Sequence, residues 1–165
     1  MSVPSNDLLT LLARTPATVR TILEDLPEHL LHASVGEGGS SPVIALARLI
    51  QGEMDNWILL EESVGLSEII ESAKHTRLTQ DHSLDEMLAQ FSNLRKTTLI
   101  AFSRLLEGGK DLDGDCTQQG LRDDTLQELL ATYAVNDLTH IARIVRTVAA
   151  QFDDGAVYGS NTNRS

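Results

Sequence analysis

The sequence has few aromatic residues, a single cysteine and no long apolar run. Phe, Trp and Tyr together make up 4% of the 165 residues, so we expect an aliphatic core. The single cysteine, Cys116, cannot pair within the chain, which excludes a disulfide scaffold and fits a reducing compartment. No segment approaches the roughly 20 apolar residues of a membrane span, and the N-terminal MSVPSNDLLT lacks the basic and apolar regions of a signal peptide. We therefore expect a cytoplasmic protein without membrane contact.

Basic residues are also scarce. The 13 Lys and Arg residues against 24 Asp and Glu residues give a net charge of −11. Such a surface repels phosphate backbones, so we expect no nucleic-acid partner. The length is that of one domain, and a hydrophobic fraction of 41% excludes a disordered chain. We assign residues 1–154 to one helical domain and residues 155–165 to a polar C-terminal tail.

Apolar residues recur at helical spacing, and the segments between them carry helix start and stop signals. Capping boxes stand at 83–86 and 125–128, and a capping residue precedes a proline at 15–16 and 41–42. The pattern predicts a short helical segment at 6–13, four main helices at 16–26, 42–64, 84–107 and 126–152, and loops at 32–41 and 65–82. We therefore predict an all-α fold, a four-helix bundle. The connection between the second and third main helices is long enough for them to run parallel through a crossover.

Three charged residues fall within the apolar faces of the predicted helices. Glu53 lies in the apolar stripe of the second helix, Arg95 in that of the third and Asp137 in that of the fourth. A buried charge without a partner costs several kcal/mol, so buried charges are expected to pair. We predict an ion pair or triad of Arg95 with Asp137 or Glu53 inside the bundle. The alternative is that these groups line a polar cavity between the helices.

Several motifs follow one another along the predicted helices. On the second helix, Ser41 and Pro42 precede LIQGE at 49–53 and then Trp57, and the fourth helix carries DLTHIA at 137–142. In this order the motifs resemble those of the DinB-like superfamily of damage-inducible four-helix proteins, over nearly the whole chain. The resemblance implies a four-helix bundle with a crossover connection, and we accordingly expect a homodimer.

The resemblance also implies a metal site that this sequence does not retain. Many members hold a divalent metal with one histidine of the second helix and two of the fourth, and some use it with low-molecular-weight thiols. Matched to that motif, Arg48 and Asn136 stand in place of two histidines, His140 is kept, and Arg143 replaces a glutamine. Arginine is permanently protonated and has no lone pair to offer a metal ion. We therefore predict a degenerate metal site with neither a metal nor another cofactor.

Two interpretations of these replacements stay open. In the first, Arg48 and Arg143 lie on solvated faces and His140 is a core histidine. In the second, Arg48, Asn136, His140 and Arg143 bind a small acidic molecule, since arginine and asparagine offer fixed hydrogen-bond donors. The candidate ligand-binding residues are Arg48, Glu53, Trp57, Asn136, Asp137, His140 and Arg143.

We interpret the chain as a small-molecule-binding or dimerising module that has lost the metal chemistry of the superfamily. One alternative is a metal-dependent thiol transferase or isomerase with a rearranged site, in which Glu53 or Asp137 joins His140 around a metal. Another is a bundle whose exposed faces bind a different protein. We assign no catalytic residue, and the sequence does not decide whether the chain is an enzyme.

Overall fold

The computed structural model describes the backbone of residues 4–34, 39–64, 82–108 and 123–158, and the side chains of 4–34, 39–55, 82–107 and 127–152. Its helices are α1 (Ser5–Leu23), α2 (Glu28–His32), α3 (Pro42–Val64), α5 (Leu84–Gly108) and α6 (Asp123–Tyr158). The described residues form helices and no strand, so the predicted all-α class is confirmed. Over this part of the chain, no helix combines enough length with enough apolar character to cross a bilayer.

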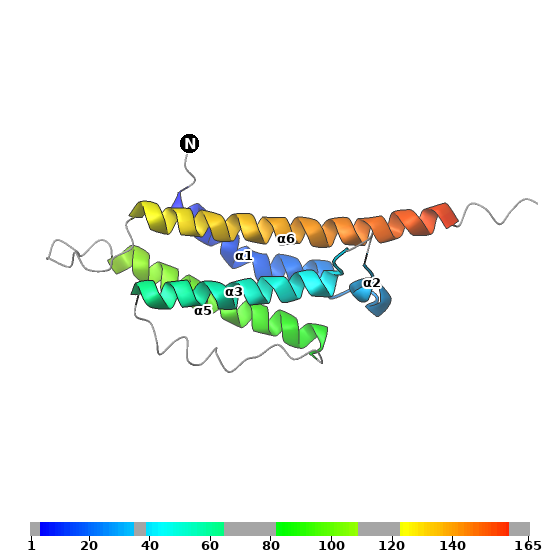
Figure 1. The fold of residues 1–165 in the computed structure, drawn as a ribbon, viewed down its shortest axis with the longest axis horizontal. Helices are drawn as coiled ribbons and strands as arrows, with labels where there is room; N and C mark the ends of the chain where they lie inside the picture. The colour runs from blue at the N-terminus through cyan, green and yellow to red at the C-terminus, as the bar shows by residue number, and fades with distance from the viewer. Residues whose placement is uncertain (1–3, 35–38, 65–81, 109–122, 159–165) are drawn as a thin grey trace, which may run out of the picture.

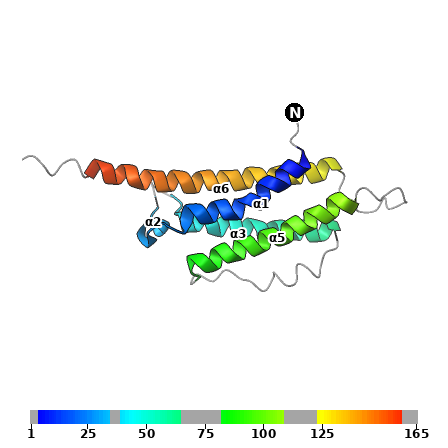
Figure 2. The same cartoon turned by 180° about the vertical axis from the view of Figure 1, so that it is seen from behind.

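The four long helices lie side by side along the long axis of the molecule (Figures 1 and 2). Helix α3 packs against α5 and α6, and α1 packs against the same two helices. The colour gradients in Figure 1 show that α3 and α5 run in one direction, whereas α1 and α6 run in the opposite one. Each helix therefore has one parallel and one antiparallel neighbour.

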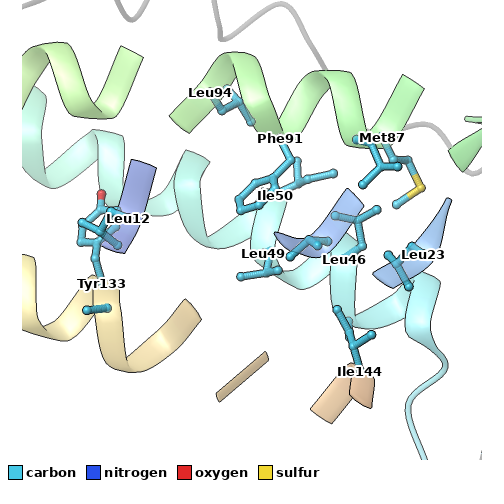
Figure 3. Close-up of a cluster of buried hydrophobic side chains, with 14 of the residues drawn as sticks. Leu12, Leu23, Leu46, Leu49, Ile50, Met87, Phe91, Leu94, Tyr133 and Ile144 are labelled. Carbon is cyan, nitrogen blue, oxygen red and sulfur yellow. The ribbon is translucent and has the colours of Figure 1, made fainter. Parts of the chain in front are cut away.

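The core between these helices is mostly aliphatic, as the low aromatic content predicts. Figure 3 shows Leu12 and Leu23 of α1 in the same cluster as Leu46 of α3 and Ile144 of α6. Aromatic side chains add one contact across the bundle. The rings of Phe102 in α5 and Tyr133 in α6 meet edge to face, with centroids 5.3 Å apart and planes at 88°.

Two of the predicted helix starts are confirmed by their capping hydrogen bonds. The Ile44 N–H donates to the Ser41 hydroxyl at 3.3 Å, directly before Pro42 opens α3. At the start of α5, the Glu86 N–H donates to the Ser83 hydroxyl at 3.3 Å, and the Ser83 N–H donates to the Glu86 carboxylate at 2.8 Å. These reciprocal bonds form a capping box, and they lower the pKa of Glu86.

The prediction for the start of the last helix is wrong. Helix α6 begins at Asp123, so Thr125 lies inside its first turn rather than at its cap. The helix also continues to Tyr158, past the polar residues at 153–154. A Thr-x-x-Glu pattern permits a capping box but does not prevent the backbone from entering the helix earlier.

The break predicted before Pro16 is also wrong, because α1 runs without interruption from Ser5 to Leu23. A proline inside a helix has no N–H to donate to the carbonyl four residues earlier, which here is that of Leu12. That carbonyl accepts a hydrogen bond from Nη1 of Arg95 in α5 at 3.3 Å. A distant side chain thus satisfies the group that Pro16 leaves unpaired, and the helix continues.

Helix α2 was not expected from the sequence. It is short, and its local signal is limited to Pro27 followed by Glu28 in the first turn. Tertiary contacts stabilise it, because Leu31 is buried and the Gln151 amide of α6 donates to the carbonyls of Leu30 and Ala33 at 3.2 and 3.0 Å. Residues 65–81 of the predicted connection, Cys116 and residues 159–165 of the predicted tail lie outside the described residues.

Replacing Ser83 with Ala removes the oxygen that accepts the Glu86 N–H at the start of α5. We expect the free energy of unfolding to fall by about 1 kcal/mol, as for other lost N-caps. Urea denaturation followed by circular dichroism measures this change. Ser103→Ala, at an exposed serine late in the same helix, is the control and should change stability by less than about 0.5 kcal/mol. Equal losses for the two variants would contradict the capping role.

Candidate functional site

The three charged residues predicted to pair inside the bundle do so. We call Glu53 of α3, Arg95 of α5 and Asp137 of α6 the buried ion triad, since all three are buried. The Arg95 guanidinium donates to both Asp137 oxygens, from Nη1 at 2.6 Å and from Nη2 at 2.8 Å. Its Nη2 also donates to Oε1 of Glu53 at 2.5 Å. The two parallel bonds to Asp137 form the fork geometry that makes arginine–carboxylate pairs strong and directional.

The surroundings of Arg95 connect it to every long helix. Its bond to the Leu12 carbonyl reaches α1, and its guanidinium carbon lies 5.3 Å from the centre of the Phe91 ring, one turn earlier in α5. The hydrogen bonds with Asp137 and the charge of Glu53 outweigh the effect of burial, so the pKa of Arg95 is raised. The arginine is therefore a fixed cation at the centre of the bundle.

Sequence reasoning missed two members of this network, the Leu12 carbonyl and Thr98. The signal for the first was present, because Pro16 removes the N–H that would occupy that carbonyl. Thr98 stands three residues after Arg95, and its hydroxyl lies 2.7 Å from Oε2 of Glu53 and 3.2 Å from the Leu94 carbonyl. Threonine in a helix commonly bonds the carbonyl four residues earlier, so its long-range partner was not evident.

The Glu53 carboxyl holds a proton more readily than an ordinary glutamate does. Burial raises its pKa above the ordinary 4.5, although Arg95 and Thr98 lower it. When Glu53 is ionised, the one hydroxyl proton of Thr98 is shared between the Glu53 carboxylate and the Leu94 carbonyl. With a proton on Oε2 of Glu53, the carboxyl can donate to Thr98 while Thr98 donates to Leu94. This proton also reduces the net charge of the triad from −1 to zero.

The second group of predicted site residues lies between α3 and α6. Arg48 and Arg143 both affect the pKa of His140 through their charges, so the two guanidinium groups lie near the imidazole. Asn136 faces α3 directly, since a Cβ added at Gly52 would lie 3.4 Å from its amide nitrogen. We call Arg48, Asn136, His140 and Arg143 the basic cluster.

The pKa of His140 is lowered, which favours the neutral imidazole. Burial lowers its pKa first, followed by the charges of Arg143 and Arg48, while Asp137 acts in the opposite direction. Its Nδ1 is buried and has no hydrogen-bond partner. Arg48 is exposed, as expected for a solvated face, whereas Arg143 is only half-buried. Within the described part of the chain, neither arginine forms an ion pair with a carboxylate.

The residues of the basic cluster do not fit a divalent metal. The cluster supplies one imidazole, one amide and two cations, whereas a zinc site needs three or four imidazole, carboxylate or thiolate ligands. Neither Glu53 nor Asp137 is free to complete such a site, because both carboxylates bind Arg95. No group of three or more His, Cys, Asp and Glu residues is placed to hold a metal ion among the described residues.

Outside the buried ion triad and the basic cluster, the described residues add no predicted group to the candidate site. The side chain of Trp57, predicted to line it, lies outside the described residues. A hollow of about 430 Å³ opens elsewhere, between the start of α1 and the end of α5. Among the described residues that line it, Glu107 alone is ionisable, and none of the predicted site residues is among them.

Comparison of the chain with models of known protein families and with curated proteins gave no match.

The two carboxylates of the buried ion triad should respond differently to neutral replacement. Asp137→Asn removes the forked partner of a buried guanidinium, and we expect a loss of about 3–5 kcal/mol in the free energy of unfolding. Glu53→Gln should cost less than about 1 kcal/mol, because an amide keeps an oxygen for Arg95 and a donor for Thr98. Urea denaturation at pH 7 measures both. Asp55→Asn is the exposed control on α3, and losses of the same size for Glu53→Gln and Asp137→Asn would contradict the assignment.

The raised pKa of Glu53 also predicts a pH dependence of stability. A carboxyl with a higher pKa in the folded state binds its proton more tightly there, so it stabilises the protein fully below about pH 4.5. This contribution is lost as the pH rises through the folded-state pKa. The unfolding free energy of the wild type should therefore fall relative to that of Glu53→Gln as the pH rises from about 4.5 through the folded-state pKa of Glu53. Parallel pH profiles for the two proteins would show that Glu53 does not bind this proton.

Proposed function

We propose that the chain is a DinB-like helical bundle that has exchanged the metal site of that superfamily for an anion site. The order of the motifs on the second and fourth predicted helices supports this proposal. The arrangement of α3 and α5 supports it as well, since neighbouring parallel helices must be joined by a long crossover connection. The segment between the two helices, residues 65–83, is long enough for that role.

The observation that carries the proposed function is the charge of the basic cluster. Arg48 and Arg143 both act on the imidazole of His140 through their charges, and neither pairs with a carboxylate that the structure describes. Their repulsion disfavours the imidazolium and would be relieved by a bound anion.

The donor chemistry favours a small carboxylate or a similar oxyanion. Each guanidinium presents N–H groups in a planar fork that matches two carboxylate oxygens. The amide of Asn136 supplies a neutral donor, and His140 becomes a second kind of donor when an anion favours its protonation. We infer that ligand binding and proton uptake by His140 are coupled.

A panel of small carboxylates, including acetate, succinate and citrate, tests this function by thermal unfolding. At ten times the dissociation constant, a ligand stabilises the folded chain by about 1.4 kcal/mol, which raises Tm by about 3–5 °C. Arg48→Ala should abolish the shift. Arg104→Ala, which removes an exposed arginine from α5, should leave it unchanged. The absence of any shift in the wild type across the panel would reject the anion site.

A second measurement separates specific binding from a general salt effect. The pKa of His140, followed by NMR titration of its ring protons, should rise when the active carboxylate is added. It should also rise in Arg48→Ala without ligand, because one of the charges that lower it has been removed. A carboxylate that raises Tm equally in wild type and Arg48→Ala would act elsewhere on the protein.

A further inference from the structure

Helix α6 has a second apolar face, on which the large side chains are exposed and the alanines at 131 and 142 are half-buried. The apolar residues of this face follow one another at intervals of four and three residues in turn, which is the spacing of apolar residues in a coiled coil. We call these positions the α6 seam: Ala131, Val135, Leu138, Ala142, Val145, Ala149 and Phe152. At about 1.5 Å per residue, the seam extends for roughly 32 Å along the helix.

The large side chains of the α6 seam are strongly exposed. The relative exposures are 64% for Val135, 52% for Leu138, 46% for Val145 and 61% for Phe152. These values contrast with the buried face of the same helix, where Leu130 and Ile144 are fully covered. Single exposed apolar residues are normal, but a continuous row of them on one helix face marks an interaction site. Figure 1 shows α6 along one edge of the molecule, extending beyond the other long helices at its C-terminal end.

From this seam we infer that α6 binds α6 of a second copy of the chain, in antiparallel orientation, about a two-fold axis at Ala142. In that register Ala142 meets its own copy and Leu138 meets Val145 of the other chain. The two outer layers pair Val135 with Ala149 and Ala131 with Phe152. A two-fold interface must be complementary to itself, because each residue pair occurs twice.

The side-chain sizes favour a second copy over an unrelated partner. In the outer layers, the large residues Val135 and Phe152 each meet an alanine of the other copy. On the axis, the two copies of Ala142 face each other. Such alternation of large and small residues lets facing helices interdigitate. The side-chain sizes in the outer layers are therefore complementary to those of the reversed seam about residue 142, a property that binding to a different protein would not require.

The charges around the seam are compatible with pairing of two copies. Although the chain carries 24 acidic residues, the only one between positions 129 and 152 is Asp137, which is buried against Arg95. Beside the seam, exposed Arg146 of one copy would lie near Thr139 of the other, so no like charges face each other. Two highly acidic chains can thus approach along a stretch of α6 in which no exposed acidic residue lies between positions 129 and 152.

The α6 seam is distinct from the basic cluster. Asn136 faces α3, whereas Leu138 points about 200° away around the helix, at 100° per residue. Pairing through the seam therefore leaves the proposed anion site open, and either proposal can fail without the other.

Sedimentation velocity of the full chain tests the pairing. We expect a species of twice the 18.0 kDa chain mass at micromolar concentration. Leu138→Glu should raise its dissociation constant about a hundredfold or more, because each dimer carries the substitution twice. Ile100→Glu is the matched control, since Ile100 of α5 is 49% exposed and lies outside the seam. A monomeric wild type, or equal weakening by both substitutions, would overturn the proposal.

Cysteine cross-linking tests the orientation in a Cys116→Ser background. Ala142→Cys should give a disulfide-linked dimer under mild oxidation, because this residue lies on the axis opposite its own copy. Ala149→Cys should not, whereas Val135→Cys mixed with Ala149→Cys should. Equal cross-linking of Ala142→Cys and Ala149→Cys alone would indicate parallel helices and overturn the antiparallel register. Failure of Ala142→Cys to cross-link, with the variant still folded by circular dichroism, would likewise overturn it.

Discussion

The guanidinium of Arg95 contacts all four long helices, and this set of bonds determines how they are placed along one another. A core made mostly of leucine and isoleucine can pack in several registers with little difference in energy. The Arg95 fork accepts few geometries, because it must meet Asp137 of α6, Glu53 of α3 and the Leu12 carbonyl of α1 together. Buried ion networks add little net stability, but they penalise every arrangement that leaves one charge unpaired.

Helix α6 serves three separate purposes on three faces. Its inner face contributes Leu130, Asp137 and Ile144 to the core, and the face toward α3 contributes Asn136 and His140 to the basic cluster. The outer face carries the α6 seam. A helix that packs on one side only needs a single apolar stripe. The additional stripe, which has no exposed acidic residue between positions 129 and 152, is what makes this helix the proposed functional element of the chain.

A metal site and the anion site proposed at the basic cluster have one property in common, which is that both present positive charge to a ligand. A divalent cation and a pair of guanidinium groups both supply two positive charges to a ligand. The metal needs lone pairs from its protein ligands, whereas arginine brings its charge without a bound ion. In the proposed DinB-like bundle, replacement of two histidines by Arg48 and Asn136 therefore removes Lewis-acid chemistry but keeps the means to attract a carboxylate.

The sequence alone determined the helices whose start signals lie within one turn, as at Ser41 and Ser83, and it placed Glu53, Arg95 and Asp137 on inward faces where they had to pair. These properties depend on local hydrogen bonds and on helical periodicity, which are visible in a linear sequence. Only the tertiary structure decided that α1 continues through Pro16, that α2 forms, and that Thr98 joins the buried ion triad. Each of these depends on a partner far away in the chain, Arg95 for Pro16, Gln151 for α2 and Glu53 for Thr98, and such partners meet only once the helices have packed.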